Sequence, residues 1–307
     1  MRVAITGGTG YLGSMLLQRL RGEGHDAFAV RRGPASDPRS MWDPAAGWVR
    51  PGTFEGVDAV VFLSGTSIGA ARWTAKRRAA LREARIGSTR VLVEHLRTLP
   101  APPRTLLTAS AVGFYGDTGD HEVREGAPQG AGFLATLVGD WEREGDRAQE
   151  FGMRVVHARF APSLARNSEV IEKLLLPFQL GLGGRIGSGR QWFSWVASED
   201  AIAARTFLLA HDSIEGAVNI VAPGAVRNAD FTRALGRALH RPTVFPIPAF
   251  ALRALFGRGI ADEMLLISQR AYPARLLDAG FRFTYPTIDE ALAASFSPAG
   301  TPSMTAA

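Results

Sequence analysis

The chain of 307 residues contains no cysteine and only two lysines, Lys76 and Lys173. Without cysteine it has no disulfide framework, no thiolate nucleophile and no cysteine-ligated zinc or iron–sulfur cluster. The histidines are dispersed, with no pair at helical spacing, so no metal site is predicted. No apolar stretch reaches the roughly 18 residues that a membrane-spanning helix needs. The chain starts with an apolar, strand-like segment, so we expect no signal peptide, no membrane partner and a cytoplasmic location.

The charge balance is basic, with 35 Lys plus Arg against 29 Asp plus Glu and a net charge of +6. A nucleic-acid interface would need a continuous basic stripe, but the arginines are scattered and only Lys76-Arg77-Arg78 forms a dense run. A solvated basic face is therefore favoured, and nucleic-acid binding is an alternative that rests on net charge alone. The hydrophobic content of 46% fits one large or two closely joined globular domains.

Strand-like and helical patterns alternate through the first half of the chain. Such alternation predicts an α/β fold with a doubly wound parallel sheet over residues 1–160. From about Phe160 the pattern loosens, and glycine and proline interrupt it at residues 181–189 and 242–248. We expect residues 161–296 to form a smaller C-terminal lobe on the substrate side, interleaved with the first domain and without an independent core. Residues 297–307 are small and polar, which predicts a disordered tail. The expected elements are strands at 2–6, 26–31, 57–63, 104–110 and 153–159, and helices at 11–23, 74–99 and 133–150.

A glycine-rich turn, Gly7-Gly8-Thr9-Gly10-Tyr11-Leu12-Gly13, follows the first strand and leads into a helical pattern. Glycine allows the tight strand-to-helix turn and lets the backbone approach a pyrophosphate, while Gly13 lets helix and sheet pack closely. The helix N-terminus adds free N–H groups and a partial positive charge. Strand, glycines and helix together predict a dinucleotide-binding Rossmann domain.

The end of the second strand indicates which dinucleotide binds. An NAD site usually has Asp or Glu there, which accepts hydrogen bonds from the ribose hydroxyls. This chain has Arg31-Arg32, whose guanidinium groups suit a 2′-phosphate. NADP is therefore predicted as the cofactor. The alternative is that one of the two arginines only extends into solvent.

The sequence resembles the extended short-chain dehydrogenase/reductase superfamily, and within it the epimerase-like group, over nearly its whole length. The resemblance implies a Rossmann domain with a small C-terminal substrate lobe, and a homodimer, since related proteins are often dimers. It also implies that Leu63 and Ser64 line the ribose side of the cofactor and that Arg85 reaches it from a long helix. An exposed helical arginine is the alternative for Arg85. The matching segments are the glycine-rich turn and residues 42–44, 58–65, 72–74, 110–116, 175–178, 180–184, 187–192 and 273–277.

The catalytic pair typical of that superfamily is missing. Its active members use Tyr-x-x-x-Lys with a Ser or Thr, the lysine lowering the tyrosine pKa from about 10 so that the phenol can move a proton. Neither lysine here has a tyrosine four residues before it. The remaining candidates near the nicotinamide are Ser110, at the end of a strand, and Tyr115. Each has a structural alternative: a satisfied hydroxyl for Ser110, and packing or turn chemistry for Tyr115.

Arg190, in the stretch Gly189-Arg190-Gln191-Trp192, is the predicted substrate-binding residue, since it suits a phosphate or carboxylate. The alternative is a hairpin loop with two buried tryptophans. The chain departs from the sequence pattern of the resembled group at residues 159–166 and at Ala197.

The glycine-rich turn, the two arginines after the second strand and the family resemblance together predict an NADP(H)-binding oxidoreductase or nucleotide-sugar-epimerase-like protein that acts on a small molecule. The rival hypothesis is a non-catalytic NADP(H) sensor or regulatory module.

Overall fold

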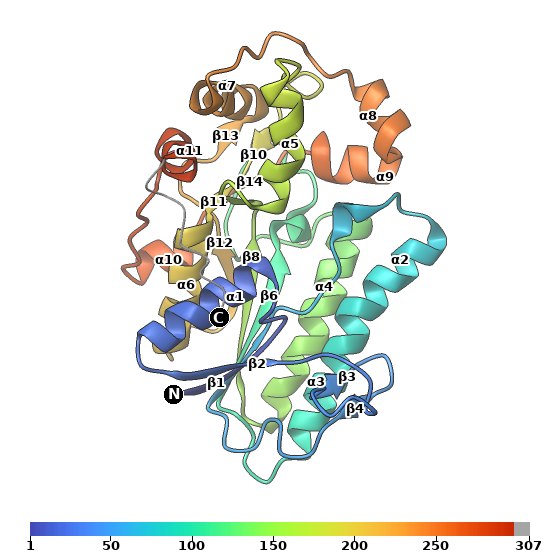
Figure 1. The fold of residues 1–307 in the computed structure, drawn as a ribbon, viewed down its shortest axis with the longest axis vertical. Coiled ribbons are helices and arrows are strands. Elements are labelled where there is room, and N and C mark those ends of the chain that lie inside the picture. The colour runs from blue at the N-terminus through green and yellow to red at the C-terminus, as the bar shows by residue number, and fades with distance from the viewer. Residues whose placement is uncertain (298–307) are drawn as a thin grey trace.

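The computed structural model describes residues 1–297 and has a six-stranded parallel sheet at its centre (Figure 1). The strand order is β12-β8-β6-β5-β1-β2. After β1 the chain forms β2 on one side and then returns to form β5 on the other, so the order of strands reverses between β1 and β5. This confirms the predicted α/β doubly wound fold. The strands are β1 (Arg2–Thr6), β2 (Asp26–Val30), β5 (Ala59–Phe62), β6 (Thr105–Ala111), β8 (Arg154–Phe160) and β12 (Gly216–Ile220).

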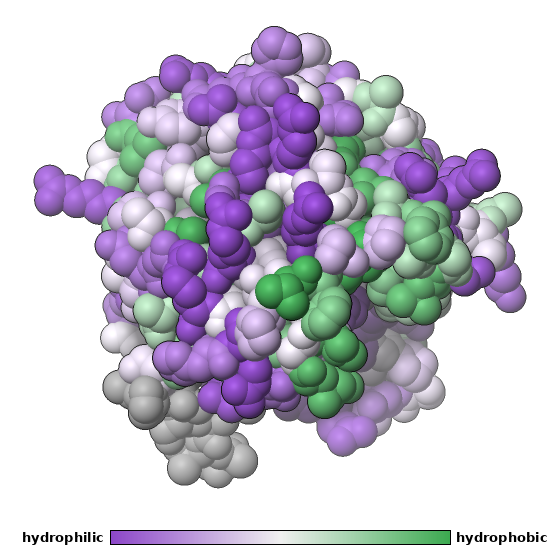
Figure 2. Space-filling model, turned by 90° about the horizontal axis from the view of Figure 1, so that it is seen from above, coloured by the Kyte–Doolittle hydropathy of each residue, from purple (hydrophilic) through white to green (hydrophobic). Residues whose placement is uncertain are grey.

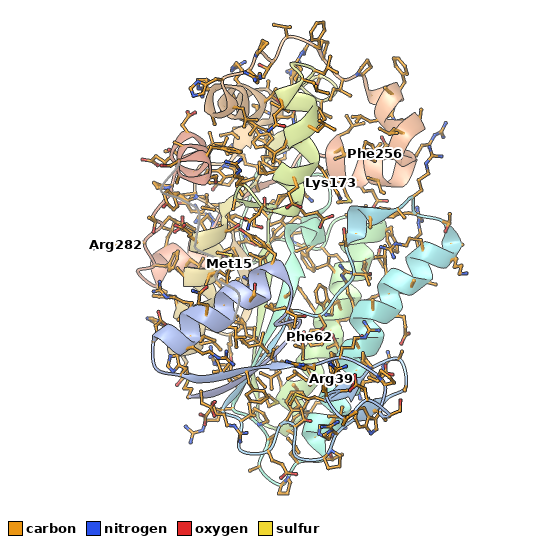
Figure 3. The ribbon with its side chains drawn as sticks, in the orientation of Figure 1. Met15, Arg39, Phe62, Lys173, Phe256 and Arg282 are labelled. Atoms are coloured by element: carbon orange, nitrogen blue, oxygen red, sulfur yellow. The ribbon has the colours of Figure 1, made fainter. Side chains whose placement is uncertain are left out.

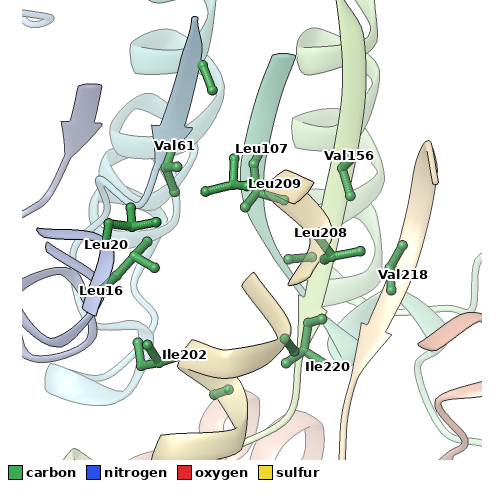
Figure 4. Packing of buried hydrophobic residues seen from close by; sticks show 14 of the residues in the cluster. Leu16, Leu20, Val61, Leu107, Val156, Ile202, Leu208, Leu209, Val218 and Ile220 are labelled. Atoms are coloured by element: carbon green, nitrogen blue, oxygen red, sulfur yellow. The ribbon is translucent and has the colours of Figure 1, made fainter. Parts of the chain in front are cut away.

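Helices cover both faces of this sheet. On one face α1 (Tyr11–Gly22) and α6 (Ser198–Ala210) bury Leu16, Leu20 and Leu208 against the strands (Figure 4). On the other face lie α2 (Ala75–Arg82), α3 (Ser88–Arg97) and α4 (Phe133–Asp146). Leu106 packs toward α3 and α4, while its neighbour Leu107 packs toward α6, as the two-residue period of a strand requires. A sheet buried on both faces explains why its strands appear as apolar runs in the sequence.

The chain after β8 supplies both sheet and lobe elements. β12 and α6 complete the central sheet and its cover, so residues 161–296 are interleaved with the first domain in space. The predicted helix at 74–99 is α2 and α3 joined by a π-helical turn at Glu83–Gly87. The predicted tail lies outside the described residues except for Ser297.

The C-terminal lobe has a core of its own, so the prediction of a lobe without one was wrong. Its buried cluster includes Leu164, Phe178, Trp195, Phe231 and Leu292. These residues lie far apart in the chain on separate strands and helices, and no local periodicity links them. The lobe elements in this cluster are β9 (Ser163–Leu164), α5 (Glu169–Gln179), β10 (Trp192–Phe193), β11 (Val196–Ala197), β13 (Val226–Arg227), α7 (Asn228–Leu239) and α11 (Ile288–Phe296).

The outer end of the lobe exposes several large apolar side chains among polar ones (Figure 2). Leu176, Leu180 and Phe250 are each more than 60% exposed, at 64%, 64% and 74%. Within residues 1–297 no helix is both long and apolar enough to cross a membrane. The remaining elements are β3 (Trp42–Asp43), β4 (Trp48–Val49), β7 (Glu122–Val123), β14 (Arg270–Ala271), α8 (Ala249–Phe256), α9 (Arg258–Ile260), α10 (Ala274–Asp278), 3₁₀ turns at Ile68–Ala70, Val112–Tyr115 and Arg147–Phe151, and a π turn at Ala261–Leu265.

Candidate functional site

The glycine-rich turn lies where the strand order reverses, between the ends of β1 and β5. Gly7 has a φ of +70°, and a Cβ there would come within 2.8 Å of the carbonyl oxygen of Leu63. The same Cβ would lie 3.1 Å from the backbone nitrogen of Ser64. A Cβ on Gly13 would come within 2.2 Å of the carbonyl oxygen of Gly7. The turn therefore requires glycine at both positions, and it places Leu63 and Ser64 directly beside the loop.

The N-terminus of α1 faces the end of the sheet without a capping side chain. Gly10 is its N-cap residue, and the first helical turn contains no acidic residue. A Cβ on Gly10 would have one neighbour within 4 Å, the carbonyl oxygen of Gly7 at 3.3 Å. Free N–H groups, the helix dipole and this open space suit an anionic pyrophosphate. Thr9 is exposed at the turn, while Tyr11 and Leu12 in the first turn of α1 are half-buried.

Arg85 is buried beside the segment that follows β5, so it is not an exposed helical arginine. It lies in the π-helical turn and is only 7% exposed, and its Nη2 donates to the carbonyl oxygen of Thr66 at 2.9 Å. Its guanidinium carbon lies 5.5 Å from the ring centre of Trp141 on α4. Burial, with a smaller contribution from Arg77, lowers the pKa of Arg85 to about 10. Nη1 is buried without a hydrogen-bond partner, which leaves this cation incompletely satisfied.

Arg31 and Arg32 follow β2 at the edge of the sheet, and both are exposed. Arg31 lines a pocket of about 460 Å³, whereas Arg32 is absent from its lining and forms a backbone bridge with Trp42. The carbonyl oxygen of Arg31 accepts hydrogen bonds from the backbone N–H groups of Met41 and Trp42, at 2.8 and 3.2 Å. The structure therefore places the two predicted phosphate ligands in different surroundings.

Ser110 is buried and directed toward α4. Its hydroxyl donates to Glu142 at 2.5 Å. The same carboxylate receives two hydrogen bonds from Arg159, at 2.8 Å from Nε and 2.7 Å from Nη2. All three side chains are buried. Ser110, near the end of β6, thus hydrogen-bonds to a buried ion pair between Glu142 on α4 and Arg159 on β8.

Tyr115 belongs to the same buried network. Its hydroxyl donates to Asn219 at 2.7 Å and accepts from Nη1 of Arg159 at 3.0 Å. Burial raises the pKa of Tyr115, and the charge of Arg159 offsets this only in part. The backbone N–H of Asn219 in turn donates to Glu125 at 3.2 Å. The phenol therefore stays protonated at neutral pH, and both its donor and acceptor roles are filled.

Helix α4, which packs against the end of β6 that carries Ser110, contains neither tyrosine nor lysine. Lys173 lies on α5, where its Nζ is 2.6 Å from Glu169 of the same helix and donates to the carbonyl oxygen of Gly69, in the segment after β5, at 3.5 Å. Glu169 also accepts from the hydroxyl of Ser67 at 2.5 Å. Figure 3 shows Lys173 at the lower end of α5, where the lobe meets the sheet half of the molecule.

Arg190 lies in an exposed turn of the lobe, away from the buried network. Its carbonyl oxygen accepts a hydrogen bond from Arg227, which also forms an ion pair with Asp120 at 2.7 Å. Nearby Trp192 is half-buried between two guanidinium groups, and Trp195 is fully buried. The side chain of Arg190 is exposed and forms no ion pair within residues 1–297.

The sequence did not single out Glu142, Arg159, Asn219 or Arg77 for this region. Arg77 donates to the carbonyl oxygen of Ser67 at 2.6 Å and lies close enough to Arg85 to lower its pKa. The only signal was the departure of residues 159–166 from the pattern of relatives, which coincides with Arg159 and its ion pair. These four residues come from four separate elements, α4, β8, β12 and α2, and their spacing in the chain does not indicate that they lie in one region.

Comparison with known proteins identifies the family. Residues 3–221 match the NAD dependent epimerase/dehydratase family, and residues 247–295 match DUF1731, a domain of unknown function. The chain belongs to the NAD-dependent epimerase/dehydratase family. It is 44% identical to Epimerase family protein Mb2239 of Mycobacterium bovis over 291 residues, which cover 94% of this chain and 96% of that protein. It is 36% identical to Epimerase family protein SDR39U1 of Bos taurus over 296 residues, 95% and 98% of the two chains.

Solved structures agree with this assignment. The crystal structure of human epimerase family protein SDR39U1 with NADPH has a TM-score of 0.87 and 32% identity, covering 96% of this chain and 99% of that one. A nucleoside-diphosphate sugar epimerase from Corynebacterium glutamicum has a TM-score of 0.78 and 31% identity, covering 96% of this chain and 57% of that one. The predicted membership of the extended short-chain dehydrogenase/reductase superfamily, in its epimerase-like group, is confirmed. The chain has an NAD(P)-binding epimerase-family fold, and the roles of individual residues stay predictions.

Proposed function

We propose that this protein is an NADP(H)-dependent oxidoreductase or nucleotide-sugar-epimerase-like enzyme that acts on a small molecule. The observation that carries the proposal is the uncapped N-terminus of α1 at the reversal point of the sheet, with Arg31 at the end of the adjacent strand. Dinucleotides bind at this point in doubly wound sheets. The NADPH in the human SDR39U1 structure supports NADP(H) rather than NAD(H).

Each predicted residue has a specific task in this proposal. The N–H groups that follow Gly10 bind the pyrophosphate, and Leu63 and Ser64 line the ribose side. Arg31 and Arg32 bind the 2′-phosphate. Arg85 reaches the ribose side of the cofactor from the π-helical turn between α2 and α3.

When bound, NADP(H) donates or accepts a hydride, so the chain must control the accompanying proton. Ser110 and Tyr115 are the proposed catalytic hydroxyls. Because Ser110 donates to Glu142 and Tyr115 donates to Asn219, each must exchange a buried partner for substrate before it transfers a proton. A protonated phenol can act as an acid but is a poor base. We therefore expect any activity to be stronger as NADPH-dependent reduction than as NADP-dependent oxidation.

Cofactor choice is tested by changing Arg31 and Arg32 together to Ala. NADPH affinity should fall by roughly 1.5–3 kcal/mol for each charge-assisted hydrogen bond lost, while NADH affinity stays the same. Fluorescence titrations of both cofactors against wild type and variant measure this. Equal losses for the two cofactors would contradict a 2′-phosphate role.

A second candidate function, a non-catalytic NADP(H) sensor, is favoured by the absence of Tyr and Lys from α4 and by the occupied hydroxyls of Ser110 and Tyr115. A screen of carbonyl compounds and sugar nucleotides for NADPH consumption separates the two. Turnover that falls in Ser110→Ala and Tyr115→Phe supports the enzyme and its site. Tight NADPH binding without turnover across the panel supports the sensor.

A further inference from the structure

The pocket beside the end of β2 is lined by three arginines. It has a volume of about 460 Å³, and Arg31, Arg39 and Arg50 are among the residues that line it. The other lining residues are Met41, Pro51, Gly52 and Thr53. Arginine is strongly suited to phosphate because its planar fork donates two parallel hydrogen bonds.

The backbone holds these arginines together although they are separated in the chain. Met41 donates from its N–H to the carbonyl oxygen of Arg31 at 2.8 Å, and Arg50 donates from its N–H to the carbonyl oxygen of Met41 at 2.9 Å. The second bond lies next to the β3–β4 hairpin, whose strands pair Trp42 with Val49. The three side chains therefore emerge from one hydrogen-bonded unit rather than from independent loops.

Positive charge exceeds negative charge in this pocket. Asp37 is the carboxylate within reach, and Arg39 contacts both of its oxygens at 3.2 Å. This contact lowers the pKa of Asp37, with smaller contributions from Arg50 and Arg31. Within residues 1–297 neither Arg31 nor Arg50 forms an ion pair, and Arg50 donates only to the backbone carbonyl of Asp37, at 3.4 Å. Two of the three charges are thus available for an anion.

One lining residue, Arg31, directly follows β2, the strand that packs against the glycine-rich turn. A Cβ on Gly8 would lie 2.8 Å from the Cβ of Ala29 on β2, so this strand supports the turn directly. Arg31 follows Ala29 by two residues, the spacing that returns to the same face of a strand. A dinucleotide whose pyrophosphate lies on the N-terminus of α1 extends its adenosine toward the end of β2.

We propose that Arg39 and Arg50, with Arg31, form the site for the 2′-phosphate of NADP(H), and that Asp37 competes with this phosphate for Arg39. This inference rests on the proposed function, and it changes the expected contribution of Arg32, which lies outside the pocket lining. The ligand class is a 2′-phosphorylated adenosine. NADPH carries this group on a dinucleotide, and adenosine 2′-monophosphate carries it alone.

The test measures binding of NADPH, NADH and adenosine 2′-monophosphate to wild type and to Arg39→Gln, Arg50→Gln, Arg32→Gln and Asp37→Asn. Arg39→Gln and Arg50→Gln should each weaken NADPH and adenosine 2′-monophosphate by about tenfold or more and leave NADH unchanged. Arg32→Gln should have a smaller effect than either. Asp37→Asn retains an acceptor oxygen for the turn but removes the competing charge, so NADPH should bind about two- to fivefold more tightly.

Arg282→Gln is the matched control, because it removes one positive charge from an exposed position far from Arg39 in Figure 3. It should change no affinity. Suppose that wild type prefers NADPH over NADH and that Arg39→Gln and Arg50→Gln keep this preference. The inference is then overturned, whereas the proposed function survives. If wild type binds neither dinucleotide, the proposed function fails and this inference fails with it.

Discussion

Alanine at Gly13 should destabilise the fold, because the added methyl group meets backbone that cannot move aside. A Cβ there would lie 2.2 Å from the carbonyl oxygen of Gly7 and 2.8 Å from the Cα of Gly8. Overpacking of this kind typically costs roughly 1–3 kcal/mol, and contact with backbone rather than a flexible side chain favours the upper end. The gain in helix propensity from glycine to alanine is about 1 kcal/mol. We expect a net loss of about 2 kcal/mol in the free energy of unfolding.

The same helix offers two matched controls. A Cβ on Gly22 would have no neighbour within 4 Å, so Gly22→Ala should leave stability unchanged or raise it by up to about 1 kcal/mol. Gly10 has a φ of −77°, which alanine adopts freely, and its one close contact is at 3.3 Å. Gly10→Ala, and still more Gly10→Val, should therefore keep the fold and lose dinucleotide binding.

Urea unfolding followed by circular dichroism, with an NADPH titration of each folded variant, measures both effects. The expected order of stability is Gly22→Ala at or above wild type, Gly10→Ala near wild type and Gly13→Ala well below. If Gly13→Ala unfolds at the same urea concentration as Gly22→Ala, the close packing of the turn is refuted. If Gly10→Val binds NADPH as wild type does, the pyrophosphate does not lie on this turn.

Three further predictions concern buried or partly buried polar groups. Tyr115→Phe should lower the free energy of unfolding by about 1–3 kcal/mol, measured in urea, because Asn219 loses its donor; an unchanged value would contradict the network. Burial raises the pKa of Glu169, but hydrogen bonds from Lys173 and Ser67 outweigh this and lower the pKa below 4.5. Wild type should therefore be more stable than Glu169→Gln above pH 4.5. This difference should vanish as the pH falls through the lowered pKa. Acid titration of both proteins would show a constant difference if the bridge were absent. Burial lowers the pKa of Arg205 to about 9, and its guanidinium carbon lies 3.9 Å from the ring centre of Phe160. Arg205→Met should be as stable as wild type or more so at pH 7, with an advantage that shrinks above pH 9 as the folded wild type loses its proton. Marked destabilisation at pH 7 would show that the contact with Phe160 outweighs the cost of burying the charge.

Local features of the chain were sufficient to predict the parallel sheet and the position of the glycine-rich turn. The apolar runs of a sheet covered on both faces, and a turn whose geometry depends on glycines within seven residues, are encoded by neighbours in sequence. The absence of Tyr-x-x-x-Lys was also fully decided by the sequence, because two lysines exhaust the possibilities.

Long-range contacts decided which hydrogen-bond partners the polar side chains have, and no local sequence pattern indicates these contacts. Ser110 meets Glu142 across 32 residues, and Tyr115 meets Asn219 across 104, because β6, α4 and β12 converge only when the sheet forms. The core of the C-terminal lobe was missed for the same reason, since its members come from separate elements spread between Leu164 and Leu292. A hydrogen bond depends on the final position of both partners, whereas a strand pattern depends only on which residues are apolar. The sequence by itself therefore determined the fold class and the position of the glycine-rich turn, and only the tertiary structure decided which hydroxyls are already bonded.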